Sequence, residues 1–556
     1  MLTNSFIADQ FDLLSKLMDI HQENSFKSKS YSSAAFAIEK LPFELSSFEQ
    51  HQIASLKGIG ESSAKKIIEL LETQKLSVLE EMLSKTPEGI IEMMRIKGLG
   101  PKKIATIWHE MGIETIGELL YACNENRLLL YKGFGEKTQK NVADAIEFFM
   151  RNQGHFLYAD VESYAQQFKS VLSKQFPNNQ FEICGDYARQ VPTLDELFWL
   201  TDADLKYIQE FLIENDFTVS DLETHRFTAK GVENLRMAFH FTTPDYFLKD
   251  QFRLTGSPTF IQAWDNEFIN HSNPYPNQTD WKTTLDIHYI PPFLRENAEV
   301  IAAAKSSSFD QIIQTNQIKG IIHSHSNWSD GSNTIEEMAV ACIAQGFEYL
   351  VISDHSKSAF YANGLNEERI KAQHQYIEEL NNKYAPFKIF KSVESDILND
   401  GALDYSDNLL GSFDLIIASV HSNLKMTEEK AMGRLLNAIE NRFTTILGHP
   451  TGRLLLSRKG YPIDHEKIID ACIANKVAIE INAHPRRLDL DWSWIHRAQE
   501  KGALLSINPD AHYIEGFKDV KYGVLAAQKG GLRKENNLSS FTLTEFEAYL
   551  NASRRA

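Results

Sequence analysis

Nine side chains of the kinds that bind divalent metals are concentrated in the C-terminal part of this 556-residue sequence. They are His323, His325, Asp330, His355, Glu394, His421, His449, Asp510 and His512. Nine ligands are too many for one tetrahedral zinc ion. A mixture of imidazole and carboxylate groups suits a cluster of Zn or Mn ions. Because such ions lower the pKa of a bound water towards about 7, we expect metal-dependent hydrolysis with a metal-bound water as the nucleophile.

The elements that would position these side chains are short β-rich segments that alternate with longer amphipathic ones. Seven such segments follow residue 319: Gly320–His323, Tyr349–Ser353, Ile389–Val393, Asp414–Val420, Thr444–Leu447, Val477–Ile481 and Ala503–Ile507. This alternation predicts a parallel barrel related to the TIM type, in which catalytic groups lie at the C-terminal strand ends. Only the sixth segment lacks a ligand, since we place His484 outside the set. Thr334 and Glu337 predict a helix that begins with a capping box.

Basic side chains near the ends of these strands would bind a substrate phosphate. Four arginines are candidates: Arg453, Arg458, Arg486 and Arg487. Arg453 is the preferred phosphate clamp, because it follows His449 by four residues and a guanidinium binds phosphate through two hydrogen bonds.

A different phosphate-binding pattern is repeated three times in the first third of the chain. Each copy is a Gly-x-Gly turn between helix-like segments, with lysines at the start of the second one. The glycines are Gly58, Gly60, Gly98, Gly100, Gly133 and Gly135, and the lysines are Lys65, Lys66, Lys102, Lys103 and Lys137. Such turns let backbone N–H groups approach an anion closely. The pattern therefore predicts DNA binding through phosphates, independent of base sequence, and it resembles the helix-hairpin-helix motif of DNA repair proteins.

Composition and charge indicate a folded protein with an uneven charge distribution. The net charge is −18, of which residues 151–318 carry −10, whereas residues 51–140 carry +1. The four cysteines form no CxxC pair, which fits a reducing compartment. The first residues lack the basic and apolar regions of a signal peptide, and no apolar run has the length of a membrane span. We expect a cytoplasmic protein with no membrane partner.

The C-terminal segment closely resembles a PHP domain (polymerase and histidinol phosphatase), a distorted seven-stranded barrel with a trinuclear metal site. The resemblance implies three divalent ions, Mn or Zn. One would be bound by His323, His325, Glu394 and Asp510, the second by Glu394, His421 and His449, and the third by Asp330, His355 and His512.

The order of the segments resembles that of bacterial family X DNA polymerases. The segments that carry this resemblance are Tyr31–Ala35, Leu254–Ser257 and Tyr289–Glu296. It implies a multidomain fold with three parts. Residues 1–150 would form an all-α helix-hairpin-helix region, residues 151–300 an α+β nucleotidyltransferase-like palm, and residues 319–556 the α/β PHP barrel.

The polymerase site of that family is degenerate here. Where the family has a GSxRR segment, Asp186 replaces the phosphate-contacting serine. The DxD pair becomes Glu196 and Phe198, and Ala238 stands in place of the third aspartate. Two Mg ions need several carboxylates, so we expect Mg binding and polymerase activity to be lost from the palm. Asp202 and Asp204 are interpreted as the first turn of a helix with Thr201 as its N-cap.

The leading functional hypothesis is a DNA repair nuclease, including base excision repair. By resemblance it would be a 3′–5′ exonuclease with 3′-phosphatase or abasic-site endonuclease activity, acting as a monomer on gapped DNA or 3′ ends. Three alternatives stay open. They are an active bifunctional polymerase and exonuclease, a phosphatase for small molecules of the histidinol phosphate type, and a non-enzymatic DNA-end scaffold with structural metals.

Overall fold

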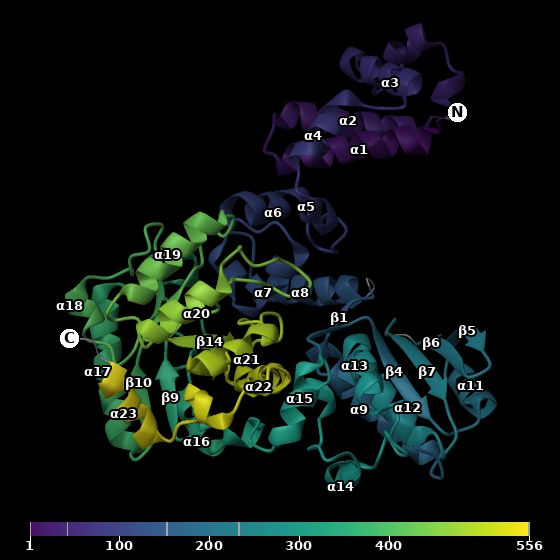
Figure 1. The fold of residues 1–556 in the computed structure, drawn as a ribbon. Helices are drawn as coiled ribbons and strands as arrows, with labels where there is room; N and C mark the ends of the chain where they lie inside the picture. The colour runs from purple at the N-terminus through teal and green to yellow at the C-terminus, as the bar shows by residue number, and fades with distance from the viewer. Residues whose placement is uncertain (1, 42, 152–153, 232–233, 554–556) are drawn as a thin grey trace. The chain divides into compact units, whose positions relative to one another are not determined.

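The structure, a computed structural model, describes all residues except 1, 42, 152–153, 232–233 and 554–556 (Figure 1). The chain separates into two compact units, residues 1–147 and 148–556. The palm-like region and the barrel therefore belong to one unit. Each unit has its own hydrophobic core.

The first unit is helical. Helices α1 to α8 span Asn4–Ile20, Ser25–Glu39, Glu61–Thr73, Ser77–Lys85, Glu88–Met93, Pro101–Ala105, Ile116–Asn124 and Glu136–Arg151. The buried side chains of α1 to α4 share one core, which includes Phe11, Tyr31, Ile67 and Leu79. The segments before the first and third glycine turns, Gln50–Ser55 and Arg127–Leu130, are 3-10 helices, which suits stretches this short.

The palm-like region contains one mixed sheet of five strands. The strands are β2 (Phe181–Cys184), β4 (Glu196–Thr201), β5 (Thr218–Glu223), β6 (Arg226–Lys230) and β7 (Arg236–Phe241), in the order β2-β4-β7-β6-β5. A separate pair joins β1 (Phe156–Leu157) to β3 (Thr193–Leu194). The helices α9 to α15 span Tyr158–Gln175, Gly185–Ala188, Leu205–Glu214, Phe247–Leu254, Pro258–Phe268, Trp281–Leu285 and Glu299–Ser306.

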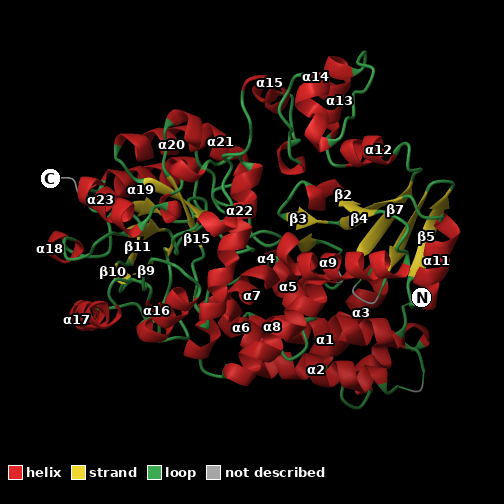
Figure 2. Cartoon of the chain, turned by 90° about the horizontal axis from the view of Figure 1, so that it is seen from below, coloured by secondary structure: helices red, strands yellow, loops and turns green. Residues whose placement is uncertain are grey.

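The two faces of this sheet are covered by different helices. Leu197 and Trp199 of β4 share a core with residues of α9 and α11, whereas Leu200 packs with Phe247 of α12. This division follows from the alternation of side chains along a strand. In Figure 2, α9 and α12 lie on opposite sides of β4 and β7.

The C-terminal part is a barrel of parallel strands. The strands β8 to β15 span Gly320–Ile321, Tyr349–Ile352, Lys388–Lys391, Glu394–Asp396, Ile417–Ser419, Ile446–Leu447, Ala478–Asn482 and Leu505–Asn508. The helices α16 to α23 span Ile335–Ala344, Glu367–Tyr384, Asp407–Leu410, Glu428–Glu440, His465–Ala474, Trp492–Lys501, Val520–Lys529 and Leu543–Ser553.

Each of the seven predicted barrel segments overlaps a strand, and a further strand that was not predicted, β11, follows the third. The sheets β10-β9-β8 and β11-β12-β13-β14-β15 are joined by the parallel bridges Ser324–Ala511 and His355–Glu394. These bridges close the strands into the distorted barrel that the sequence predicts. The capping box of Thr334 and Glu337 is also present, at the start of α16.

One predicted local feature of the palm-like region is wrong. Thr201 is the last residue of β4, and the N-cap of α11 is Asp204, whose side chain accepts a hydrogen bond from the Lys206 N–H. Thr201 remains in the strand because it pairs with Phe181 and Phe241 on both sides.

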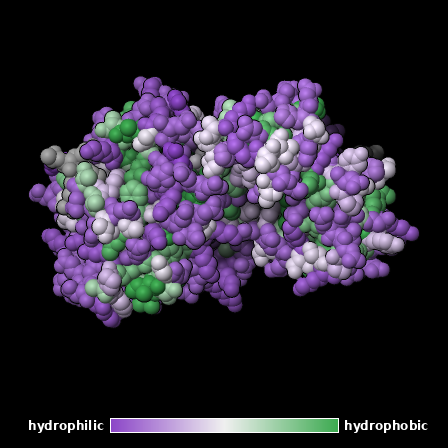
Figure 3. All heavy atoms as spheres, turned by 60° about the horizontal axis from the view of Figure 1, so that its bottom comes forward, coloured by the Kyte–Doolittle hydropathy of each residue, from purple (hydrophilic) through white to green (hydrophobic). Residues whose placement is uncertain are grey.

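The surface is mainly hydrophilic on the face that Figure 3 shows, and its hydrophobic areas there are small. Among the described helices, none combines the length and the apolar character needed to cross a bilayer.

Candidate metal centre

The nine predicted ligands come together where the barrel strands end. Eight of them form three groups, and within each group the candidate ligand atoms lie within 4.8 Å of one another. One group contains His323, His325, Glu394 and Asp510; another contains His325, Asp330, His355 and His512; the third contains His355, Glu394 and His421. His449 joins them through Nε2, 3.0 Å from Glu394 Oε1. Among the described residues, all groups of this kind lie in the barrel.

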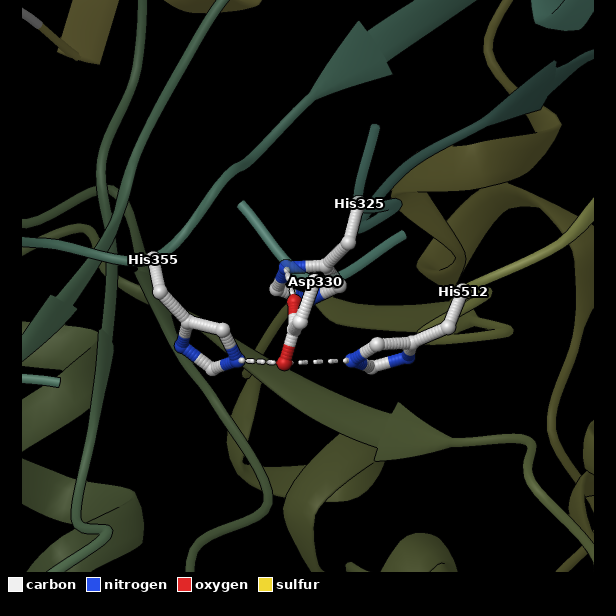
Figure 4. A group of neighbouring side chains, drawn as sticks. All are labelled: His325, Asp330, His355 and His512. Carbon is white, nitrogen blue, oxygen red and sulfur yellow. Dashed lines mark ion pairs between the residues drawn. The ribbon is translucent and has the colours of Figure 1, made fainter. Parts of the chain in front are cut away.

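The group around Asp330 shows how the loops place their ligands. Figure 4 shows the rings of His355 and His512 on opposite sides of one Asp330 oxygen, with each Nε2 3.6 Å from Oδ2. The His325 ring stacks on both imidazoles, at centroid distances of 4.4 and 4.3 Å. Gly331 allows this loop to fold back closely, because a Cβ there would lie 2.1 Å from the His325 carbonyl oxygen.

The donor set fits bound cations. Glu394 is 1% exposed, and its Oε2 makes no hydrogen bond although it lies 3.1 Å from His355 Nδ1. Buried carboxylates of this kind are stabilised by opposite charge. The backbone is strained at three ligands, since His323, His449 and Asp510 have φ angles of 63°, 22° and 53°. Strain of this type is concentrated at functional sites.

Burial and neighbouring charges determine the protonation of the cluster. Burial lowers the pKa of His355 to about 3, so its imidazole is neutral and can donate a lone pair. Burial acts in the same direction on His421, but the carboxylates of Glu394 and Asp396 outweigh it and raise the pKa of His421 to about 10. Burial also disfavours the charge of Glu394, yet His421 and His323 hold its pKa well below the ordinary value.

Two aspartates that the sequence did not single out support the ligands. Asp396 lies 2.6 Å from Nδ1 of His421 and fixes the orientation of that ring. Asp354 accepts hydrogen bonds from Ser326, Ser329 and Gln373 and so holds the loop that carries Asp330. Asp396 had a detectable signal, because it follows Glu394 by two residues and therefore shares its side of the strand.

The structure gives the predicted phosphate clamp another role. Arg453 donates to the carbonyl oxygens of Arg487 and Leu488 and pairs with Asp491, so it braces the loop that follows β14. Arg487 is the arginine beside a predicted ligand, with Nε 3.8 Å from Asp510 Oδ2 and 5% of the residue exposed.

The three Gly-x-Gly turns of the first unit have one conformation. Their first glycines, Gly58, Gly98 and Gly133, have φ angles of 90°, 94° and 98°, a region that favours glycine. The residue between each pair of glycines is buried: Ile59, Leu99 and Phe134. The second glycines, Gly60, Gly100 and Gly135, have open space where a Cβ would lie.

The lysines follow these glycines at the starts of α3, α6 and α8. Lys65, Lys102 and Lys137 are exposed, whereas Lys66 and Lys103 are partly buried. Lys103 donates a hydrogen bond to the Gly98 carbonyl oxygen. The open glycines and the exposed lysines give each turn a surface that an anion can approach.

Two residues of the predicted degenerate palm site lie next to each other in the sheet. Phe198 of β4 and Ala238 of β7 are register partners on adjacent parallel strands. Phe198 packs against the hydrophobic cluster of Cys184, Leu200 and Phe247. Two apolar side chains therefore lie side by side at this point of the sheet.

The remaining polar groups of this site are bound to one another. Glu196 lies 3.5 Å from Nε of Arg236, its register partner on β7. Asp186 pairs with Arg189, and Arg189 Nε lies 3.1 Å from Glu296. Arg189, which lies in the segment that resembles GSxRR, is thus paired with carboxylates of the protein itself.

Comparison with known proteins assigns the segments to families. Residues 2–76 match a helix-hairpin-helix domain, residues 90–147 a SAM-like helix-hairpin-helix tandem, and residues 322–484 the PHP domain. The chain is 32% identical to the DNA polymerase/3′-5′ exonuclease PolX of Bacillus subtilis, over 96% of both chains. It is also 28% identical to a probable phosphatase of Caldanaerobacter subterraneus, over 32% of this chain and 70% of the relative. A probable phosphatase of Thermoanaerobacter is 27% identical over 40% of this chain and 90% of the relative.

Proposed function

Because this chain belongs to the PolX family of DNA polymerase/3′-5′ exonucleases, we propose that it is a DNA-end nuclease without polymerase activity. The observation that supports the proposal is the convergence of nine buried or nearly buried candidate ligands at the ends of the barrel strands, eight of them in three groups and His449 beside Glu394. The substrate is a DNA 3′ end or gap, and the reaction is metal-dependent hydrolysis of a phosphodiester with release of nucleotides in the 3′–5′ direction.

The metal centre would be held by residues of this chain alone. His323, His325, Glu394 and Asp510 would hold one ion, and the groups around Asp330 and His421 the others. Divalent Mn or Zn ions bound there would activate water and offset the charge of the phosphate. Glu394 lies in two groups and holds them together. Arg487, buried beside Asp510, is placed to bind a non-bridging phosphate oxygen.

The helix-hairpin-helix turns supply the contact with DNA. Their open glycines and exposed lysines suit phosphates spaced along a backbone. Loss of polymerase activity rests on Phe198 and Ala238, which cannot bind Mg and lie opposite each other on β4 and β7.

A primer assay tests both parts of the proposal. The purified full chain is incubated with Mn²⁺ and a 5′-labelled primer–template, with and without dNTPs. We expect shortening from the 3′ end and no extension. His449→Ala should slow shortening by more than about 100-fold, since even supporting residues of a metal site contribute 10–100-fold. His496→Ala, an exposed histidine paired with Glu500, is the matched control and should keep full activity. Robust extension that disappears in Glu196→Ala would contradict the proposal.

A second candidate is hydrolysis of a small phosphomonoester, which the names of the probable phosphatases suggest. These relatives align with only 32% and 40% of this chain. Hydrolysis of a small phosphomonoester would also make no use of the three Gly-x-Gly turns of the first unit. Turnover of a 3′-phosphorylated oligonucleotide is compared with that of histidinol phosphate. Faster turnover of histidinol phosphate would favour the second candidate.

A further inference from the structure

The strand β14 is the one barrel strand whose segment carries no predicted ligand, yet it contributes a buried acid to the same region. Glu480 lies in the middle of β14 and is 0% exposed. A carboxylate in such a position must be compensated by hydrogen-bond donors. Glu480 has four of them, and two belong to predicted metal ligands.

The donors are divided evenly between the two carboxylate oxygens. Oε2 lies 2.6 Å from His323 Nδ1 and accepts a hydrogen bond of 2.8 Å from Asn508 Nδ2. Oε1 accepts hydrogen bonds of 3.1 Å from the His449 backbone N–H and from Asn482 Nδ2. Glu480 therefore connects β14 and β15 with the loops that follow β8 and β13.

The two asparagines cannot reverse their amides without losing other contacts. Asn482 Nδ2 also donates to Asp510 Oδ2 at 3.0 Å, and its Oδ1 accepts from the His484 N–H. Asn508 Oδ1 accepts a hydrogen bond of 2.6 Å from Ser506. Both asparagines thus present N–H groups to Glu480, and only a group with two acceptor oxygens satisfies all four donors.

The contact with Nδ1 determines which nitrogen of His323 can bind a metal. If Nδ1 carries the hydrogen and donates it to Glu480, the lone pair of a neutral imidazole lies on Nε2. That Nε2 is 3.2 Å from Glu394 Oε1 and 3.3 Å from Asp510 Oδ1, within the first ligand group.

We propose that Glu480 is the positioning residue of the metal centre, which fixes the His323 tautomer and the backbone of His449. The inference rests on the proposed metal-dependent function, because Glu480 acts only through these two ligands. The strand β14 would thus contribute to the metal centre as its neighbours do, but through a positioning residue and not through a ligand.

The test is Mn²⁺ binding by the full chain after removal of metal, measured by calorimetry. Glu480→Gln keeps the shape of the side chain but turns an N–H₂ group towards two donors. We expect the affinity of the tightest site to fall about 10- to 100-fold. Tyr349→Phe is the control, since it removes a buried hydroxyl that bonds to the Leu538 and Phe541 carbonyls. It should lower the melting temperature and leave Mn²⁺ affinity unchanged. Equal Mn²⁺ affinity of Glu480→Gln and the natural chain would overturn the inference.

A measurement on the natural chain is independent of whether the variant folds. With histidine labelled with ¹⁵N and Zn²⁺ bound, the His323 resonances, identified by their loss in His323→Gln, should show a hydrogen on Nδ1. A hydrogen on Nε2 would overturn the inference. By contrast, a chain that binds Mn²⁺ and loses affinity in Glu480→Gln, but does not degrade DNA, would refute the proposed nuclease and leave the role of Glu480 intact.

Discussion

At the scale of single residues, the sequence identifies ligands better than it identifies their supports. His355 and His449 could be predicted because they end β-rich segments, where barrel enzymes carry their chemistry. Asp396 and Glu480 were missed because an acid in a sequence is more often solvated than buried. Arg487 was considered but not preferred over Arg453, since only the fold shows which of them reaches a ligand.

The raised pKa of His421 gives a prediction about protons. Burial lowers the pKa of His421, but Glu394 and Asp396 outweigh burial and raise it to about 10. The metal-free protein therefore keeps this ring protonated at neutral pH. A metal ion requires the neutral ring. Mn²⁺ binding at pH 7.5 should therefore release protons, and the apparent affinity should rise with pH until about 10. Calorimetry in two buffers of different ionisation enthalpy measures the release. His421→Gln should release about one proton fewer, and identical heats in both buffers would contradict the prediction.

Arg487 gives a prediction about substrate. Arg487→Ala should lower kcat/KM for oligonucleotide hydrolysis about 10- to 100-fold, because a hydrogen bond to a charged group contributes about 1.5–3 kcal/mol. Mn²⁺ affinity should stay within about threefold of the natural chain. The matched control is Arg497→Ala, which removes a half-exposed arginine that pairs with Glu466. Undiminished activity of Arg487→Ala would show that another group binds the phosphate.

At the scale of elements, repetition made the glycine turns predictable. Three copies of one pattern require the same local backbone, and the left-handed φ angles of Gly58, Gly98 and Gly133 meet that requirement. The kind of helix before each turn could not be predicted, because segments of four to six residues form either an α-helix or a 3-10 helix according to their packing.

The exposed lysines of these turns should control the salt dependence of DNA binding. A chain with Lys65→Ala, Lys102→Ala and Lys137→Ala should bind DNA more weakly, and the slope of log K against log salt should fall by about 1 for each phosphate that the variant no longer binds. Fluorescence anisotropy at several salt concentrations measures the slope. Lys27→Ala with Lys29→Ala removes two exposed charges near the start of α2, outside the three repeats, and is the control. An unchanged slope in the triple variant would exclude phosphate binding by these lysines.

The palm-like sheet shows what alignment alone can and cannot supply. Motif spacing predicts that Phe198 and Ala238 belong to one site, and the strands β4 and β7 bring the two residues opposite each other. The packing of α12 against this site could not be predicted from the sequence. Phe247 lies 49 positions from Phe198 in the chain, and the two residues join one hydrophobic cluster only in the folded protein.

At the scale of the whole molecule, the negative charge of the palm-like region has a structural use. Residues 151–318 carry a net charge of −10, and two of their acids bind lysines of α22 in the barrel. Glu162 lies 2.6 Å from Lys521, and Glu296 pairs with Lys529, whose side chain is 0% exposed. These pairs join the palm-like region to the barrel within one compact unit.

The Lys529 pair gives a prediction about stability. Burial lowers the pKa of Lys529, and Glu296 opposes that effect. Lys529→Met should lower the free energy of unfolding by about 1.5–3 kcal/mol, the range for a hydrogen bond to a charged group. The change is measured by denaturant unfolding of the full chain, from the transition of the second unit. Lys467→Met, which removes an exposed lysine paired with Asp464, should change it by less than about 0.5 kcal/mol. A free energy of unfolding equal to that of the natural chain would show that the Lys529–Glu296 pair does not contribute to stability.

The sharing of candidate ligands between the three groups would couple the binding of ions in the proposed metal centre. His325, His355 and Glu394 each belong to two of the three groups. An ion in one group would fix a side chain that the next ion also needs. The second ion would then lose less conformational entropy on binding, because the shared side chain is already ordered. By reciprocity each ion then raises the affinity for its neighbour. The centre should therefore load cooperatively, with a steep dependence on free metal concentration. This steepness would make the barrel respond to small changes in the supply of Mn or Zn in its surroundings.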